Sequence, residues 1–500
     1  MTDRALILTI MAAYLLACVG IGIWSSRRTR SAADFFVAGK SIGVWVYGIA
    51  TFSTLLSGFG FIGGPGLVYE YGTSSFWICL PAIFGFVLSA LLVNKRLWVF
   101  AQIFDVLTLP DAVEARYESR ICRLLAALVI LLGVVGYLGV QILAFGMIAE
   151  SFFGIHPTAA ILVGVTVIIF YAVTGGIVAS LYTDLLQGSL MIFASLGVFI
   201  AAMWAAGDGS VTEAPSRITE AFLASETPEF VGPWGLMGPM LCLSWFFVFV
   251  LGGTGQPHVI TKNLMIRNAS GLRWGLLVSS LCYAMCTLLW IGVGMSMRYL
   301  VLTGQEPALS DPDHAAPRFL LNHTPAWLAG IVFAGLFSAI MSTADAFLNL
   351  GAAVCVRDIP RAILGRSVKR ELLWARIATV ITAAAATAFA LTAGDLVALV
   401  GIFSWGTFAA ALVPTVAIGF NWKRATWQAA AAAMVTGIAL HLGLEVLKRF
   451  PSPEEPVYQL PYNVDTGAVA LMASITVFIA VSLLTPRPRL SRKLETAIDV

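Results

Sequence analysis

Charge is the scarcest property of this 500-residue chain. Asp, Glu, Lys and Arg make up only 11% of the residues, and 59% are hydrophobic, whereas about 25% of a typical soluble domain is charged. Mean hydropathy is +0.88. There is no acidic or basic tail of the kind that contacts nucleic acid. The composition therefore indicates an all-α integral membrane protein in contact with the lipid bilayer, with no nucleic-acid partner.

Several functional motifs are also missing. The seven cysteines are scattered through apolar segments without a CxxC pair, and no His/Cys set has zinc spacing. We therefore expect reduced core cysteines, and we expect His258 to orient backbone rather than bind metal. No GxxxxGK[ST] stretch is present to drive transport with ATP. No nucleophile, base and orienting group come together in the apolar segments, so we do not expect an enzyme.

Long apolar runs dominate the chain instead. About 20 apolar residues span a bilayer as a helix, and we predict thirteen spans, near residues 5–25, 45–70, 75–95, 122–149, 159–174, 177–204, 236–258, 273–298, 325–352, 376–396, 398–420, 427–446 and 466–485. With the N-terminus outside and the C-terminus inside, 24 of the 30 lysines and arginines face the cytoplasm, Lys262 among them. This asymmetry follows the positive-inside rule.

Two of the predicted spans contain residues that break helices. "SGFGFIGGPG" (57–66) lies in the second span, and "LGGTGQPH" (251–258) lies five spans later. Irregular backbone is tolerated in a membrane where it lines a cavity, and paired breaks are typical of inverted repeats. The alternative is that the glycines only permit close helix packing. We predict two unwound binding segments in a single transport domain, 1–500: repeats at 45–204 and 236–420, an added helix and loop at 1–44, two added helices at 421–485 and a cytoplasmic tail at 486–500.

Polar residues gather at helical spacing in two spans. Ser338, Ser342, Asp345 and Asn349 share one face of the ninth span, and Asp184 lies in a similar cluster in the sixth. For Ser338 alone, a hydroxyl bond to a carbonyl one turn earlier is the simpler interpretation. A carboxylate inside a membrane needs a partner, and hard cations prefer oxygen ligands. The pattern predicts a monovalent cation site.

These residues carry a family resemblance. The stretches "FFVAGKSIG", "SGFGFIGGPG", "YAVTGGIVASLYTDLLQGSLM", "GQPH" and "AIMSTAD" occur in that order across residues 35–360. In this the chain resembles the sodium/solute symporter family, nearest to its bacterial proline, pantothenate and monocarboxylate branches. The resemblance implies a LeuT-like 5+5 inverted-repeat core with alternating access. It also implies Na⁺ coupling and a multi-pass place in the plasma membrane, the inner membrane of a bacterium.

The resemblance also implies site residues. The family's main sodium site corresponds here to Ser53, Leu56, Ala339, Ser342 and Thr343. Asp184 matches the aspartate of a second sodium site, but Asp345 and Ala346 stand where serines would be, so these carboxylates could hold a second cation or a proton. The residues expected to bind substrate are Ser57, Gly58, Phe59, Tyr137, Gln141 and Phe249.

The resemblance implies uptake of a small organic solute, and an amino acid such as proline fits it best. Phe59 and Phe249 stand where the proline branch has tryptophans, and Leu55 replaces an acidic residue. A Na⁺-coupled monocarboxylate or pantothenate symporter is therefore the alternative, followed by a proton-coupled symporter or a transporter-like membrane sensor. We expect the protein to work as a monomer.

Overall fold

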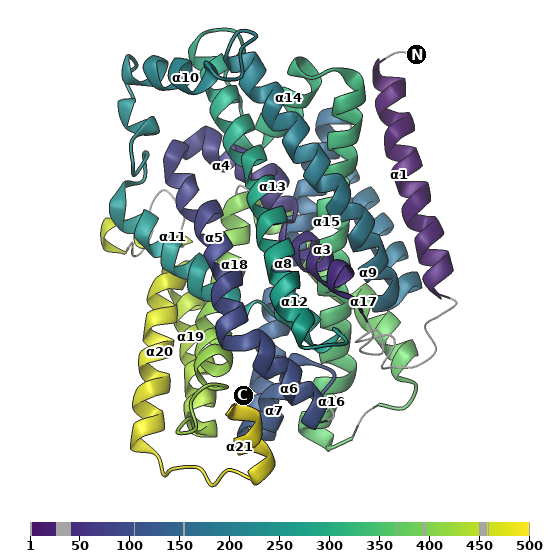
Figure 1. Ribbon diagram of the computed structural model, residues 1–500, viewed down its shortest axis with the longest axis vertical. Coiled ribbons are helices and arrows are strands. Elements are labelled where there is room, and N and C mark those ends of the chain that lie inside the picture. Colours follow the sequence, from purple (N-terminus) through teal and green to yellow (C-terminus); the bar gives the residue numbers. More distant parts are fainter. Residues whose placement is uncertain are drawn as a thin grey trace.

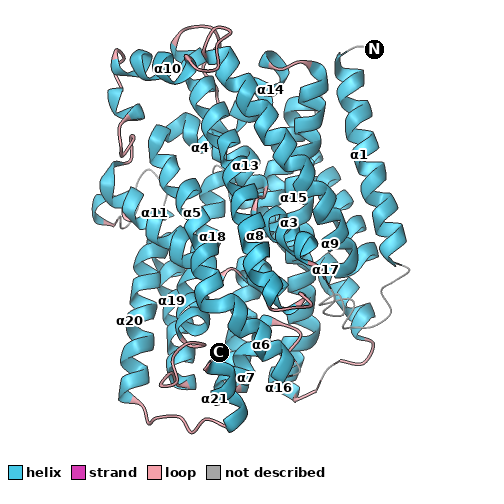
Figure 2. Cartoon of the chain, viewed as in Figure 1, coloured by secondary structure: helices cyan, strands magenta, loops and turns pink. Residues whose placement is uncertain are grey.

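The computed structural model describes residues 3–26, 42–104, 106–153, 156–366, 368–393, 397–449, 458 and 460–499. These residues form helices and loops without a strand, and one isolated bridge joins Ile42 to Ile266 (Figures 1 and 2). The helices are α1 (Asp3–Ser26), α3 (Val44–Leu55), α4 (Gly64–Tyr71), α5 (Phe76–Ser89), α6 (Lys95–Ile103), α7 (Leu109–Tyr117), α8 (Arg120–Phe153), α9 (Pro157–Ala206), α10 (Ala214–Leu223), α11 (Gly238–Gly252), α12 (Pro257–Ile260), α13 (Ser270–Leu302), α14 (Ala315–His323), α15 (Ala326–Ala353), α16 (Ile359–Leu364), α17 (Glu371–Ala393), α18 (Val397–Val413), α19 (Trp427–Arg449), α20 (Thr466–Leu484) and α21 (Arg492–Ile498).

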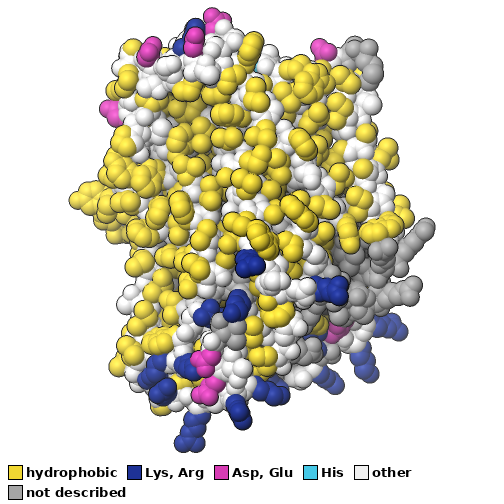
Figure 3. Space-filling view, viewed as in Figure 1, with side chains coloured by type: hydrophobic (Ala, Val, Ile, Leu, Met, Phe, Trp, Pro, Cys, Tyr) yellow, Lys and Arg dark blue, Asp and Glu magenta, His cyan; other side chains and the backbone are white. Residues whose placement is uncertain are grey.

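The surface has the charge distribution of a membrane protein. Within the described residues, eleven helical stretches are long and apolar enough to span a bilayer. On the face in Figure 3, apolar side chains cover the middle, and most lysines and arginines gather at the end that carries α6, α7 and α21. Helix α9 is continuous across the boundary expected between the fifth and sixth spans. The count of thirteen spans and the orientation remain predictions.

Helix α15 lies at the centre of the molecule. In its most apolar 18-residue stretch, 94% of the residues are buried, against 22% in the corresponding stretch of α1 and 28% in that of α19 at the periphery. It packs against α1, α3, α8, α9 and α17. Because helices surround α15, its stripe of polar residues, Ser338, Ser342, Asp345 and Asn349, faces protein rather than lipid, as expected of polar groups in a membrane.

The first break is much shorter than the sequence predicts. Helix α3 ends at Leu55, and only Leu56 and Ser57 leave the helical conformation. The chain then continues through a wide-turned helical segment, Phe59–Gly63, into α4. The following glycines permit close packing instead: a methyl group on Gly64 would lie 2.2 Å from Trp290. The packing interpretation therefore holds for part of this stretch.

The second break matches the first in backbone geometry. Helix α11 ends at Gly252, a 3₁₀ turn follows, and Gln256 is extended with φ −76° and ψ 105° before α12 begins at Pro257. Leu56 has nearly the same angles, φ −82° and ψ 104°. A residue that precedes proline is disfavoured in the helical region, so Pro257 explains the position of this break. The two breaks are equivalent in geometry as well as in sequence position.

Candidate functional site

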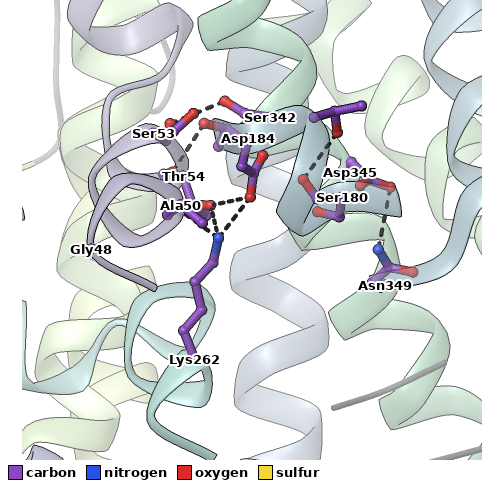
Figure 4. Close-up of polar contacts among 12 residues, drawn as sticks. Gly48, Ala50, Ser53, Thr54, Ser180, Asp184, Lys262, Ser342, Asp345 and Asn349 are labelled. Carbon is purple, nitrogen blue, oxygen red and sulfur yellow. Dashed lines mark hydrogen bonds and ion pairs between the residues drawn. The ribbon is translucent and has the colours of Figure 1, made fainter. Parts of the chain in front are cut away.

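The predicted sodium ligands lie where the end of α3 meets α15. The Ser342 hydroxyl donates hydrogen bonds to the carbonyl of Ser53 at 3.0 Å and to that of Ala339 at 3.2 Å. The Thr343 hydroxyl donates to the carbonyl of Thr54 at 3.0 Å. Figure 4 shows Ser342 directed at the α3 backbone. Oxygens from two helices therefore converge at one buried point, immediately before the first break.

The chemistry of these groups suits a hard monovalent cation. Every contributing atom is an oxygen, from carbonyls or hydroxyls, which is the ligand type that such ions prefer. Ser53, Ser342 and Thr343 are no more than 1% exposed. The Ser53 hydroxyl has no hydrogen-bond partner among the described residues. Such a buried, unpaired oxygen is costly, and it lies on the residue whose carbonyl accepts from Ser342.

Asp184 forms a buried ion pair with a residue that the sequence did not single out. Its Oδ2 lies 2.8 Å from Nζ of Lys262, and both side chains are 1% exposed. Lys262 also donates to the carbonyl of Ala50 at 2.7 Å and to the Thr54 hydroxyl. The sequence places Lys262 in a connection between spans, whereas the structure buries its side chain against α3 and Asp184. The signal was available, because a membrane carboxylate requires a partner and this lysine follows the second break by one helical turn.

The remaining members of the α15 stripe have local partners. Asn349 donates to Asp345 Oδ1 at 3.2 Å. Figure 4 places Asp345 beside Ser180 of α9. Ser338 bonds the carbonyl of Ala334 one turn earlier at 2.8 Å, as expected for that residue alone. The stripe therefore divides into a part at Ser342 that contacts the end of α3 and a separate carboxylate at Asp345.

The predicted substrate residues form two adjoining groups around the breaks. The Gly58 amide donates to Gln141 Oε1 at 2.9 Å, and the Phe59 amide donates to the Ser57 hydroxyl at 3.2 Å. Phe59 stacks on Phe249, with ring centroids 6.1 Å apart. The first group supplies polar atoms at the break, and the second forms an aromatic wall that joins the two broken helices.

Aromatic residues that we did not predict extend this wall. Trp290 meets Phe59 edge-on at 5.2 Å, and Trp405 stacks on Phe249 at 5.0 Å. Tyr137 instead stacks on Phe347 at 4.8 Å. These residues lie on helices without breaks, so no local motif marks them in the sequence.

His258 does not make the backbone contact that we expected. Neither ring nitrogen has a hydrogen-bond partner among the described residues. The ring centroid lies 4.4 Å from that of Phe347 and 5.6 Å from that of Tyr137. His258 and Lys262 line a cavity of about 40 Å³ that extends from the site toward Thr108 and Asp358.

Charged contacts close the end of the molecule beyond this cavity. Arg123 pairs with Asp111, and its Nε lies 3.5 Å from Asp358 Oδ1. Arg357 reaches Asp111 at 3.1 Å, and the Thr108 hydroxyl donates to Asp358 at 2.7 Å. The network ties α7 to α8 and to the end of the α15 segment.

At the opposite end, a buried loop carboxylate holds the start of α18. Asp313 accepts a hydrogen bond from the Val397 amide at 2.7 Å. Burial raises the pKa of Asp313 from its usual 3.8 to about 7. The contact links the loop before α14 to a central helix, so the charge of this loop depends on pH near neutrality.

Paired broken helices, a buried oxygen cluster and an all-helical membrane fold define a cation-coupled secondary transporter. The chain belongs to the sodium:solute symporter family, whose model matches residues 35–437. It is 27% identical over 444 residues to the sodium/pantothenate symporter of Haemophilus influenzae, covering 87% of this chain and 89% of the relative. It is 29% identical to the sodium/proline symporter of Escherichia coli, covering 85% and 84%.

The fold agrees with solved transporters. A substrate-bound, outward-open Na⁺-coupled sialic acid symporter superposes with a TM-score of 0.79 at 19% identity, covering 97% of this chain and 99% of that one. Mhp1, a nucleobase-cation-symport-1 family transporter, superposes with a TM-score of 0.52. The predicted family and fold class are confirmed. The protein is a Na⁺-coupled, multi-pass bacterial membrane symporter. The stretch "FFVAGKSIG" lies mostly outside the described residues.

Proposed function

We propose that the protein takes up a small amino acid, with proline as the best candidate, together with Na⁺. The ion would be held by the Ser53, Leu56 and Ala339 carbonyls and by the Ser342 and Thr343 hydroxyls. The observation that carries the sodium assignment is the Ser342 hydroxyl 3.0 Å from the Ser53 carbonyl. Similarity to several sodium/proline symporters supports the substrate class.

The pocket chemistry supports a small zwitterion. The Gly58 amide stands at the start of the helical segment that follows the break, where the positive end of a helix favours a carboxylate. A substrate carboxylate would replace Gln141 Oε1 as the acceptor of this amide. The stacked Phe59 and Phe249 rings would cover an apolar ring or side chain. One ligand would thereby contact both broken helices.

Coupling follows from the shared position of the two sites. Na⁺ between α3 and α15 would fix the end of α3, whose next residues bear the substrate amides. Each ligand would then tighten the other by the same factor. One charge moving down 100 mV supplies about 2.3 kcal/mol, which corresponds to roughly fiftyfold accumulation. Alternating access would carry both ligands through the membrane.

A thermal-shift screen tests the proposal. Purified protein in Na⁺ or K⁺ buffer would be mixed with proline, other small amino acids, lactate, acetate or pantothenate. We expect proline to raise the melting temperature in Na⁺ and not in K⁺. Equal responses in the two buffers for every ligand would contradict the proposed sodium coupling. The Ser342→Ala variant is the control, because its Na⁺-dependent shift should weaken.

Transport of pantothenate or a monocarboxylate is the second candidate. Sodium/pantothenate symporters are about as similar to this chain as the proline symporters are, at 27% and 26% identity. Phenylalanines at positions 59 and 249 make a smaller wall than tryptophans would. A Na⁺-dependent shift with pantothenate or lactate, and none with proline, would favour this candidate.

Proton coupling is a separate alternative that involves Asp345. This buried carboxylate has Asn349 as its hydrogen-bond donor at 3.2 Å, so it could carry a proton. Uptake of substrate into proteoliposomes, driven by a pH gradient without Na⁺, would favour it. We expect no uptake under that condition.

A further inference from the structure

The Lys262 ammonium is coordinated as an alkali cation would be. Its three N–H groups are directed to three oxygens of different kinds: the Ala50 carbonyl at 2.7 Å, the Asp184 carboxylate at 2.8 Å, and the Thr54 hydroxyl. Lysine has three donors and no acceptor, so this set uses its whole capacity. Carbonyl, hydroxyl and carboxylate oxygens are also the ligands of a hard cation.

This position lies beside the proposed sodium site. Thr54 contacts both: its carbonyl accepts from Thr343, a proposed sodium ligand, and its hydroxyl contacts Lys262. Asp184, the aspartate that the family resemblance associates with a second cation, contributes its Oδ2 to the ammonium. Figure 4 shows Nζ between the α3 backbone and the Asp184 carboxylate.

We propose that Lys262 is a covalently attached cation that fills the second cation position, so that the protein binds one Na⁺ per cycle. The charges support this assignment. One carboxylate faces one ammonium, both side chains are 1% exposed, and a further Na⁺ at the same oxygens would be repelled by the ammonium. The inference rests on the proposed sodium site at Ser342 for the ion that is bound.

The second carboxylate oxygen of Asp184 leads to a consequence of the proposal that can be measured. Asp184 Oδ1 has no hydrogen-bond partner among the described residues. If Lys262 were replaced by an uncharged side chain, Asp184 would keep only the weak hydrogen bond that Oδ2 accepts from the Thr54 hydroxyl at 3.3 Å, and its charge would face the Ala50 carbonyl without a cation. That arrangement has the charge and the ligands of an empty alkali-cation site. Removing the lysine should therefore create a second Na⁺ site.

The experiment is to count bound ²²Na⁺ per purified full-length protein in detergent. We expect one ion in the wild type, two in Lys262→Met and one in the double variant Lys262→Met/Asp184→Asn. Lys262→Arg keeps the charge and should bind one. A second readout is the slope of stabilisation against the logarithm of Na⁺ concentration, which reflects the number of bound ions and should double in Lys262→Met.

The difference between Lys262→Met and wild type tests this inference, whereas the wild-type count tests the proposed sodium site. An unchanged count in folded Lys262→Met would overturn the role of Lys262. Two ions in the wild type would also overturn it, even if Lys262→Met did not fold. Ser342→Ala should lower the wild-type occupancy and leave the added ion of Lys262→Met in place, which separates the two sites.

Discussion

Replacing Ser342 by alanine tests the proposed sodium site most directly. Its hydroxyl lies on the central helix α15 and reaches the Ser53 carbonyl at the end of α3. Alanine removes this oxygen and leaves no large cavity. The Ser53 and Ala339 carbonyls remain, so the site would lose one ligand of five. We expect weaker Na⁺ binding by a protein that still folds.

The size of the effect follows from the kind of interaction lost. A hydrogen bond or ligand contact to a charged group contributes about 1.5–3 kcal/mol, and each 1.4 kcal/mol changes an affinity tenfold. The Na⁺ concentration for half-maximal stabilisation should therefore rise about 10- to 150-fold. Without Na⁺, the lost contacts are neutral hydrogen bonds, so the melting temperature should fall by the equivalent of only about 0.5–1.5 kcal/mol.

The assay is Na⁺ titration of thermal stability at constant ionic strength, with choline as the balancing cation. Ser338→Ala is a matched control, because Ser338 lies one turn earlier on the same helix and its hydroxyl bonds the Ala334 carbonyl, which is not one of the proposed sodium ligands. It should leave the Na⁺ midpoint within about twofold of wild type. A Ser342→Ala midpoint within twofold of wild type would refute the assignment.

Three further variants probe charge, pH and packing. Asp184→Asn leaves the buried Lys262 ammonium without its carboxylate and should lower the free energy of unfolding by about 3–5 kcal/mol, which a lower melting temperature would show. Replacing both residues by uncharged side chains should recover most of this loss. Because folding raises the pKa of Asp313 from 3.8 to about 7, its contribution to stability is fully present below pH 4 and is lost as pH rises toward 7. Asp313→Asn should therefore flatten the dependence of the melting temperature on pH between pH 4 and 7, and an unchanged slope would contradict the burial argument. Gly64→Ala places a methyl group 2.2 Å from an indole carbon and should destabilise by about 1–3 kcal/mol, whereas Gly20→Ala, with open space around its added methyl, should not lower the melting temperature.

The sequence predicts the place of both breaks but the extent of only one. Pro257 acts locally on Gln256, so the second break can be located from neighbouring residues alone. The first stretch has five glycines whose role depends on distant helices. Gly64 lies in α4 because Trp290 of α13 needs the space, and no local rule contains that contact. Helix propensity alone therefore overestimates how many residues unwind at the first break.

The candidate site, too, was predicted where it depends on local spacing and missed where it depends on a distant contact. The stripe on α15 follows from helical spacing, and the structure does bring Ser342 to Ser53. The partner of Asp184 was not found because Lys262 lies 78 residues away in sequence. The positive-inside rule assigned that lysine to a connection between spans, because the rule uses position along the chain and takes no account of burial. The positive-inside rule tolerates such an exception, because one residue in 24 hardly changes the asymmetry.

The shortness of the two breaks affects the entropy of binding. Fixing the backbone of one residue costs about 1–2 kcal/mol, so ordering a loop of ten residues on ligand binding would consume much of the available affinity. Here Leu56, Ser57 and Gln256 are held between helices on both sides, and little backbone freedom remains to be lost. The binding free energy of ion and solute can then act on the equilibrium between outward- and inward-facing states, and backbone amides near the breaks should exchange slowly even without ligands.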